Sequence, residues 1–576
     1  MNRGVFRVLA LLGLALVLGA CVPATPGRSS DQGQTVAANE SRTFRMVTRQ
    51  EPVDLSGGGG ASRHRIPLRV FAAGLSSLDS HEAPYPVLAE SLPRLNTDTW
   101  KVFPDGRMEA IYRLRPGLQW HDGAPLTAPD FAFSFRATKA EATWGTPVLG
   151  VDDARTPAKW MDEIVALDSQ TLVIRWPQAY PAAGNLAFPP LPRHLLEAWL
   201  DRNDSDAYHG LDYWTTAYVG AGPFRLASWE RGAFIEGAAF EGYALGRPKI
   251  DRIVLTFSEK PTTTVARLLA DDVDMAVAQA IGFQETSVLK QEWVPRTQGR
   301  LLFNPNAVRH VQIQARPAYA DPAVMLDVRV RRALLHAIDR PALAEAMVDE
   351  RGMTADAMLP QVVPFYADVD RAITKYPFDI RRTEQLMAET GFAKGADGFF
   401  VSSTGGRFSP QLMGVNEGQD AQDTTIVADS LKRAGIDVQL YLYPVVLRRA
   451  SDSDEFKGSF PAMNTNSTSV TPPLLGLDEW DSPTIGTPQN NWKGHNRIGW
   501  STPEYDHLLE RFNATLDKKE GDGLLVRMLT ILSNELPVLP LYSTFFVDAH
   551  VGSLHGPEVA SPSSSLYYNI HQWEWQ

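Results

Sequence analysis

Cysteine is nearly absent from the chain, which has only Cys21 among its 576 residues. A framework of disulfide bonds is therefore excluded. The 12 histidines are scattered without the spacing of metal ligands, so we expect no metal site. Basic residues are also in the minority, because 55 lysines and arginines face 67 acidic residues and the net charge is −12. This balance argues against a protein that binds nucleic acid.

Catalytic motifs are missing as well. The sequence has neither the H-E-x-x-H motif of zinc proteases nor the G-x-S-x-G motif of α/β-hydrolases. Ser287 and Lys290 fit the acylating motif S-x-x-K, but the S-D-N and K-T-G tripeptides of that enzyme class do not occur. The four glycines at 57–60 lack the Gly-Lys-Ser/Thr that a phosphate-binding loop needs, so they predict a plain loop. We expect no enzyme, no catalytic residue and no cofactor; a serine acyl hydrolase is the remaining enzymatic alternative.

Long apolar runs are confined to the amino terminus. Two arginines precede the run Val8–Leu18, which is too short to span a bilayer as a helix. The run leads into Leu-Gly-Ala before Cys21, a pattern typical of bacterial lipoprotein signals. We predict a signal peptide at 1–20, a lipid on Cys21 and a flexible tether at 21–41. The mature chain would then be extracytoplasmic, in the periplasm or on the outer face of the cell membrane; an ordinary signal peptide with an unrelated cysteine is the alternative.

Local patterns in the second half predict alternating helices and strands. Asp327 is a natural helix N-cap, and apolar residues recur on one face of the helix that follows. A helix over roughly 424–434 should stop at Gly435, before an alternating strand at 436–443. A capping box at Ser501–Glu504 predicts another helix. These units are typical of an α/β protein, and a chain of this length needs two or three lobes.

The stretch Ile111–Arg136 predicts two short strands with tight turns and then a helix, in which Thr127 and Asp130 have the capping-box spacing. Its sequence, LRPGLQWHDGAPLTAPDFAFSF, resembles the signature of the family 5 extracytoplasmic solute-binding proteins. These proteins are the peptide and nickel receptors of ATP-binding cassette (ABC) importers. In that family the segment is mainly architectural. The resemblance therefore implies that His121 and Asp122 are turn and packing residues.

Further stretches between about residue 44 and about residue 550 are similar to the same family. They include Tyr218–Phe224, Pro248–Asp251, Asp327–Leu334 and Glu535–Tyr542. Where the family usually has Gly-Thr-Gly-Pro-Tyr, this chain has Ala221 and Phe224 but keeps both glycines and the proline. Glycine at such a place permits positive φ or a close approach of two backbones.

The resemblance implies an α/β fold, a periplasmic-binding-protein-like clamshell of type II with two lobes plus an extra subdomain, three domains in all. Lobe I would be discontinuous and would consist of 42–68, 218–308 and 533–576. Its extra subdomain would take 69–217, and lobe II would take 309–532. In this family the solute binds in the cleft between the lobes, which close about a hinge.

The implied function is that of the substrate-binding component of an ABC importer. Such a protein captures a small-molecule or peptide ligand and delivers it to a membrane permease, while ATP is hydrolysed by separate ATPase subunits. We expect a monomer, held at the membrane through its lipid. The solute is a peptide by resemblance; an oligosaccharide or another neutral polar solute is the alternative, as is a lipoprotein receptor that senses its ligand.

One predicted loop supplies the first candidate ligand residues. Asn416, Glu417 and Asp420 follow a predicted strand, at the edge where open α/β sheets bind their ligands. The two acids in this loop could balance the charge of a cationic ligand.

A second stretch supplies the other candidates. Peptide-binding relatives hold the α-ammonium of the ligand with an aspartate after a strand of the second lobe, but the matching place here has Asn464 and Asn466. Trp480 and Asp481, which follow in the sequence, are the other two candidates. A buried ammonium without a counter-charge is costly, so either the acid comes from elsewhere or the ligand is neutral. A neutral sugar would stack on an aromatic ring and be held by the two asparagines.

Overall fold

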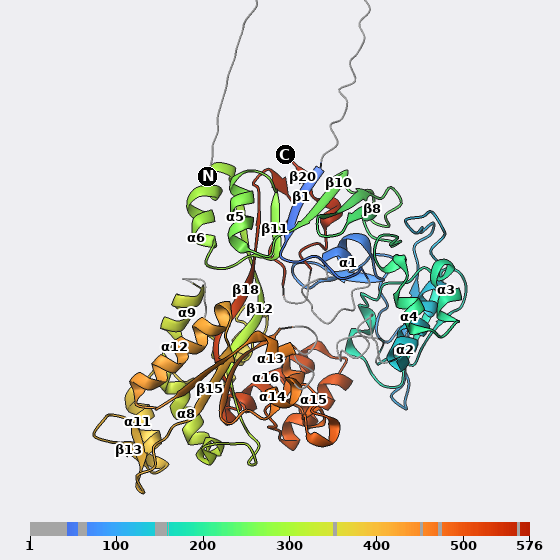
Figure 1. Ribbon diagram of the computed structural model, residues 1–576. Coiled ribbons are helices and arrows are strands. Elements are labelled where there is room, and N and C mark those ends of the chain that lie inside the picture. The colour runs from blue at the N-terminus through green and yellow to red at the C-terminus, as the bar shows by residue number, and fades with distance from the viewer. Residues whose placement is uncertain are drawn as a thin grey trace, which may run out of the picture. The chain divides into compact units, whose positions relative to one another are not determined.

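A continuous mixed sheet is the central feature of the computed structural model (Figure 1). The structure describes residues 43–55, 66–144, 158, 160–348, 354–449, 453–470, 475–561 and 565–576. In this part of the chain the sheet has ten strands, in the order β16-β15-β17-β12-β18-β11-β1-β10-β9-β8. The predicted signal peptide, the lipidation site Cys21, the tether and the glycine loop at 57–60 lie outside the described residues.

The strands fall into two groups joined by two long strands. The first strand group comprises β1 (Thr43–Thr48), β8 (Phe224–Glu230), β9 (Phe234–Ala239), β10 (Arg252–Phe257) and β11 (Met275–Ile281). The second strand group comprises β15 (Gln411–Val415), β16 (Gln439–Tyr443) and β17 (Met463–Ser469). Between them run β12 (Arg300–Ile313) and β18 (Val538–His550), which we call the crossing strands.

The crossing strands are antiparallel to each other and lie side by side along their length (Figure 1). The carboxyl end of β18 pairs with β11. The carboxyl half of β12, from Ala307 onward, pairs with β17. Their own register shifts between Pro305 and Ala307, where a proline removes a ladder donor. The sheet therefore changes from one strand group to the other around this irregularity.

Helices cover both faces of the second strand group. Their bounds are α8 (Val328–Ala337), α9 (Arg340–Val348), α10 (Tyr366–Ala372), α11 (Ile380–Glu389), α12 (Gly418–Ala434), α13 (Val445–Arg449), α14 (Ser453–Gly458), α15 (Pro503–Ala514) and α16 (Lys518–Glu535). Val311 and Ile313 of β12 belong to the core with α8, α9, α11 and α12, whereas Val308 belongs to the core with α10, α15 and α16. Because side chains alternate along a strand, the two cores lie on opposite faces.

The first strand group has its own cores. They bring together α1 (Ile66–Phe71), α3 (Arg193–Leu200), α4 (Ser205–His209) and α5 (Pro261–Leu269) with these strands and with the end of the chain near Trp573. Beside them is a separate sheet of β4 (Trp100–Val102), β5 (Met108–Arg113), β7 (Thr171–Trp176) and β6 (Glu163–Ala166), with α2 (Ala128–Trp144). This sheet has a further core, which includes Trp120 and Phe131.

The signature segment has an architectural role, as its resemblance implied. Asp130 Oδ2 accepts a hydrogen bond from the Thr127 backbone N–H at 2.8 Å, at the start of α2. The His121 ring lies within 3.0 Å of the Gly222 carbonyl and accepts from the Gly220 N–H at 3.2 Å. Burial lowers the pKa of His121 to about 4, so the ring is neutral. Asp122 contacts His194 at 2.7 Å.

Several local predictions differ from the structure. The second short strand predicted before α2 is reduced to an isolated bridge between Gln119 and Pro125. The helix α12 begins at Gly418 rather than near 424, so Asp420 lies in its first turn. The N-cap of α15 is Thr502, whose side chain accepts from the Tyr505 N–H, and not Ser501. The strand β16 begins at Gln439 rather than at 436 and is an edge strand, on which Leu440 is exposed.

Candidate functional site

The carboxyl ends of the parallel strands in both groups point toward the middle of the crossing strands. The last residue of β17, Ser469, pairs with Ala307, beside the irregularity in β12, and β15 and β16 run parallel to β17. The last residue of β11, Ile281, pairs with Val547 of β18, and β1 and β10 run parallel to β11. Ligands of open α/β sheets bind at the carboxyl ends of strands, so this region is the candidate site.

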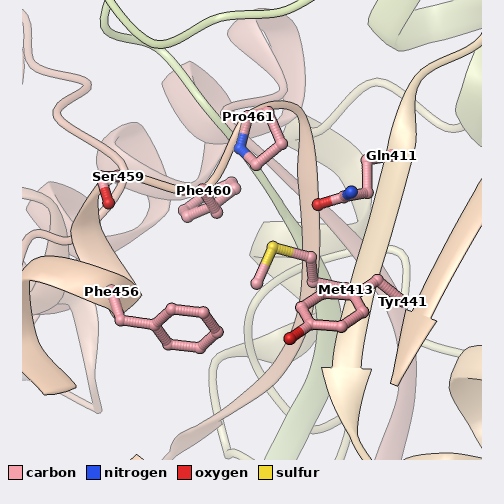
Figure 2. Close-up of a pocket in the computed structure, with 7 residues that line it drawn as sticks. All are labelled: Gln411, Met413, Tyr441, Phe456, Ser459, Phe460 and Pro461. Atoms are coloured by element: carbon pink, nitrogen blue, oxygen red, sulfur yellow. The ribbon is translucent and has the colours of Figure 1, made fainter. Parts of the chain in front are cut away.

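A cavity of about 240 Å³ lies at the opposite, amino end of β15. It is lined by Gln411, Met413, Tyr441, Phe456, Ser459, Phe460 and Pro461 (Figure 2). Gln411 begins β15, whereas the candidates Asn416, Glu417 and Asp420 follow the end of that strand. The cavity is therefore separate from the predicted ligand loop, and no pattern in the sequence indicated it.

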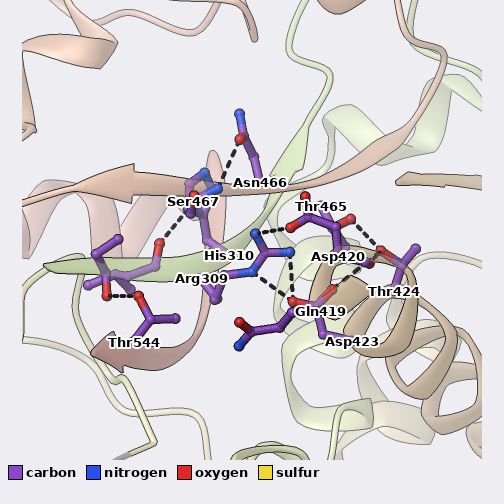
Figure 3. Close-up of polar contacts among 12 residues, drawn as sticks. Arg309, His310, Gln419, Asp420, Asp423, Thr424, Thr465, Asn466, Ser467 and Thr544 are labelled. Atoms are coloured by element: carbon purple, nitrogen blue, oxygen red, sulfur yellow. Dashed lines mark hydrogen bonds and ion pairs between the residues drawn. The ribbon is translucent and has the colours of Figure 1, made fainter. Parts of the chain in front are cut away.

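The first turn of α12 carries the first set of candidates. The Asn416 N–H donates to the Tyr443 carbonyl at 2.8 Å, and Glu417 is the N-cap residue of the helix. The Asp420 carboxylate is paired with Arg309 Nη1 of β12 at 2.7 Å (Figure 3). These three residues are brought together, and one of them is tied directly to a crossing strand.

Arg309 is the centre of a buried polar network (Figure 3). Its Nη2 and Nε lie 2.6 Å and 2.7 Å from Oδ2 of Asp423, a residue with no exposed surface. The Tyr542 hydroxyl of β18 donates to the same oxygen at 3.1 Å and accepts from Gln419 Nε2 at 3.1 Å. Burial acts to lower the pKa of Arg309, but the charges of Asp423 and Asp420 raise it above its ordinary value, so the guanidinium stays charged.

Sequence reasoning missed Arg309, Asp423 and Tyr542. The pair Arg309–Asp423 is separated by 114 residues along the chain, and Tyr542 lies 119 residues beyond Asp423. These side chains meet because α12 packs against the paired strands β12 and β18. Arg309 is a charged residue in a mostly buried stretch, which is a signal for a buried ion pair. The stretch was not predicted as a strand, so this signal was not used.

The second set of candidates lies on the other face of the sheet. Asn464 pairs in register with Gln312, and its Nδ2 donates to the Gln312 side chain at 3.3 Å. Asn466 pairs with His310, and its side chain accepts from the Ser467 N–H. Gln312 and His310 alternate with Arg309 along β12, so the asparagines are not on the side of Asp420.

Trp480 and Asp481 belong to this second side as well. Trp480 is 1% exposed and meets the His310 ring edge to face, with the ring centroids 6.5 Å apart. Asp481 precedes a short 3-10 helix and bonds the Thr484 hydroxyl; burial raises the pKa of Asp481. The seven candidates therefore form two separate sets rather than one site.

Neither a metal cluster nor a membrane span emerges from the described ranges. Within them, no group of three or more His, Cys, Asp or Glu residues is placed to hold a metal ion. Within the same ranges, no helix is long and apolar enough to cross a membrane.

Comparison with known proteins gives the family. The family model described as bacterial extracellular solute-binding proteins, family 5, middle, matches residues 83–486. The chain belongs to this family. The predicted family and the predicted function as a family 5 solute-binding protein are thereby confirmed. The family is defined by binding solutes rather than by catalysis.

Two curated relatives extend the match of the family 5 protein over most of its length. Heme-binding protein A of Haemophilus influenzae is 24% identical over 560 residues, which cover 92% of this chain and 93% of that protein. Oligopeptide-binding protein AppA of Bacillus subtilis is 22% identical over 511 residues, covering 84% of this chain and 82% of the relative.

Solved structures have the same fold as this family 5 protein. The oligopeptide-binding protein of Thermus thermophilus, complexed with a pentapeptide, superposes with a TM-score of 0.71 at 22% identity and covers 93% of this chain and 96% of its own. NikZ of Campylobacter jejuni, complexed with Ni(L-His), gives 0.69 at 18% identity, with coverage of 93% and 99%. The predicted α/β, periplasmic-binding-protein-like fold class is thereby confirmed.

Proposed function

We propose that the chain is the solute-binding component of an ABC importer and that it captures oligopeptides. The observation that carries this proposal is the convergence of parallel-strand carboxyl ends, from both strand groups, on the middle of the two crossing strands. Several relatives with 22% identity over 75% of this chain carry the name of putative ABC transporter peptide-binding proteins, which supports both the transporter class and the solute.

The proposed capture uses lobes that close on the solute. Lobe I comprises 42–68, 218–308 and 533–576, with the subdomain 69–217, and lobe II comprises 309–532. Separate hydrophobic cores on either side of the crossing strands support this division. A peptide that contacts both lobes only when they are closed shifts the population toward the closed form, which then meets the permease as a monomer.

The charges around α12 favour a solute with an ammonium group over a neutral one. Two carboxylates, Asp420 and Asp423, lie against Arg309 at this end of α12. An ammonium leaving water needs such a counter-charge. A neutral sugar would find weaker contacts, because Trp480 is buried in the core and exposes no ring face on which a sugar could stack.

The first test is binding of peptides to a variant of the α12 carboxylate. Replacing Asp420 with asparagine is expected to weaken peptide binding by about tenfold or more, since a hydrogen bond to a charged group contributes roughly 1.5–3 kcal/mol. Calorimetric titration with tri- to pentapeptides and with oligosaccharides measures the effect. Asp105→Asn, on a surface turn beside Arg107, is the matched control and should bind as the wild type does. Tight binding of an oligosaccharide, or peptide binding unchanged by Asp420→Asn, would contradict the proposal.

We further propose that the mature chain is extracytoplasmic and is anchored by a lipid on Cys21. Because this is the only cysteine in the sequence, labelling with a radioactive fatty acid tests it without ambiguity. The wild type should be labelled and should sediment with membranes, whereas Cys21→Ser should be unlabelled. An unlabelled wild type would show that the segment is an ordinary signal peptide.

A further inference from the structure

A fully buried carboxyl group lies among the strands that join the two proposed lobes. Asp548 is on β18, and its Oδ1 accepts a hydrogen bond from the Ala278 backbone N–H at 3.1 Å. Its Oδ2 accepts from the Asn304 side-chain Nδ2 at 2.6 Å. Asn304 Oδ1 in turn accepts from the Ala560 N–H at 2.7 Å. The carboxyl thus connects β11, both crossing strands and the C-terminal segment.

The backbone around this carboxyl is irregular. Between Ala276 and Ile281 the strand β11 leaves its register with β18, and Ala278 and Gln279 have φ of 51° and 64°. L-residues rarely adopt this left-handed conformation. The distortion takes the Ala278 N–H out of the ladder, and the Asp548 carboxyl supplies the acceptor that the ladder no longer provides. Asn304 directly precedes Pro305, where the register of the crossing strands shifts.

We propose that Asp548 and Asn304 are positioning residues for solute capture: they clamp the crossing strands where the lobes meet, and a proton on Asp548 opens the clamp. Both groups that contact the carboxyl are donors, so the ionised form satisfies both of them. A protonated carboxyl has one oxygen that must itself donate, and that O–H would face an N–H. The Asn304 amide then has to turn, which breaks its bond to Ala560.

The surroundings allow this titration near neutral pH. Burial raises the pKa of Asp548 to about 7, so the carboxyl takes up its proton as the pH falls through that value. Among the described residues, Tyr567 is the titratable group that senses its charge, and burial raises the pKa of Tyr567 well above its usual range, so the phenol stays neutral. His550 is two residues along β18, and burial lowers its pKa, so it stays neutral as well.

The clamp affects binding through the stiffness of the crossing strands, which are the hinge about which the proposed lobes move. With the clamp closed, the crossing strands are already ordered, so closing the lobes on a solute costs less conformational entropy. With the clamp open, more order must be imposed on closing. This step rests on the proposed function, because it assumes lobes that move about the crossing strands. Solute affinity should therefore be higher above the pKa than below it.

Amide exchange followed by mass spectrometry tests the clamp without any ligand. In the wild type, after correction for the intrinsic pH dependence of exchange, protection of the fragment containing Ala560 should fall by about tenfold between about pH 8 and about pH 6. Asp548→Asn has the shape of the protonated acid, and should show low protection at both pH values. Asn304→Ala, which removes the amide itself, should show the same flat profile. Wild-type protection that does not change with pH would overturn the proposal.

Binding of pentaalanine tests the link to capture. The wild type should bind this probe about tenfold more weakly at about pH 6 than at about pH 8, whereas Asp548→Asn should bind weakly at both. Asp105→Asn, the surface control, should keep the wild-type profile. A pH profile in Asp548→Asn equal to that of the wild type would overturn the role in capture. If pentaalanine fails to bind at any pH while exchange behaves as expected, the peptide assignment fails and the clamp stands.

Discussion

Replacing Arg309 with methionine is expected to lower the free energy of unfolding by about 3–5 kcal/mol, because it leaves a buried carboxylate without its counter-charge. Asp423 has no exposed surface, and both of its contacts to Arg309 are shorter than 3 Å. The Tyr542 hydroxyl would remain as its one hydrogen-bond donor from a crossing strand. Chemical denaturation followed by tryptophan fluorescence measures the loss.

A surface arginine provides the matched control for this experiment. Arg329 also pairs with an aspartate at 2.6 Å, Asp327, but its side chain is 45% exposed. Arg329→Met should therefore cost less than about 1 kcal/mol. Adding Asp423→Asn to Arg309→Met should recover part of the loss, since the uncompensated buried charge is removed. Equal stabilities of Arg309→Met and Arg329→Met would show that the buried network does not hold the fold together.

The same network explains how a candidate ligand residue is held. Asp420 and Gln419, in the first turn of α12, bond to Arg309 of β12 and to Tyr542 of β18. A third contact ties the helix to the other strand group, because Gln284, just after β11, donates to Gln422 at 3.0 Å. The turn is thus fixed to the strands about which the lobes are proposed to move, and its carboxylate keeps a defined position near them.

Local signals in the sequence predicted much of this architecture. The Asp327 carboxylate accepts from the Arg329 N–H as the N-cap of α8, and Gly435 ends α12 with a φ of 100°. Both depend only on residues within one turn of the helix. The packing role of the segment around His121 was predicted correctly because its sequence resembles the signature of a family. The two caps depend on interactions that lie close together in the sequence, and the signature segment was identified by its resemblance to a family.

The remaining features depend on contacts between distant segments. That β16 is an edge strand follows from the order of the sheet, so the exposure of Leu440 could not be read from its alternating pattern. The two sets of candidate ligand residues were separated by the pairing of β17 with β12, which sets Asn464 opposite Gln312. The clamp at Asp548 requires a distortion of β11 that no turn motif signals.

A single added carbon at Gly222 should be costly, and alanine there should lower the free energy of unfolding by about 1–3 kcal/mol. A Cβ on Gly222 would lie 2.4 Å from the carbonyl carbon of Phe71 and 2.5 Å from the backbone nitrogen of Ala72. The Gly222 N–H donates to the Phe71 carbonyl at 3.0 Å, and its own carbonyl contacts the His121 ring, so neither backbone can withdraw cheaply. The need for glycine here is close approach, since the conformation is not left-handed.

A second glycine offers a control of opposite sign. Gly523 lies on the exposed side of α16, and a Cβ there would meet no atom within 4 Å. Alanine is the better helix former by about 1 kcal/mol, so Gly523→Ala should raise stability by roughly 0.5–1 kcal/mol. Urea denaturation of both variants under one set of conditions gives the comparison. If Gly222→Ala were as stable as the wild type, close packing of the Gly220–Pro223 segment against the end of α1 would not be the reason for a glycine at position 222.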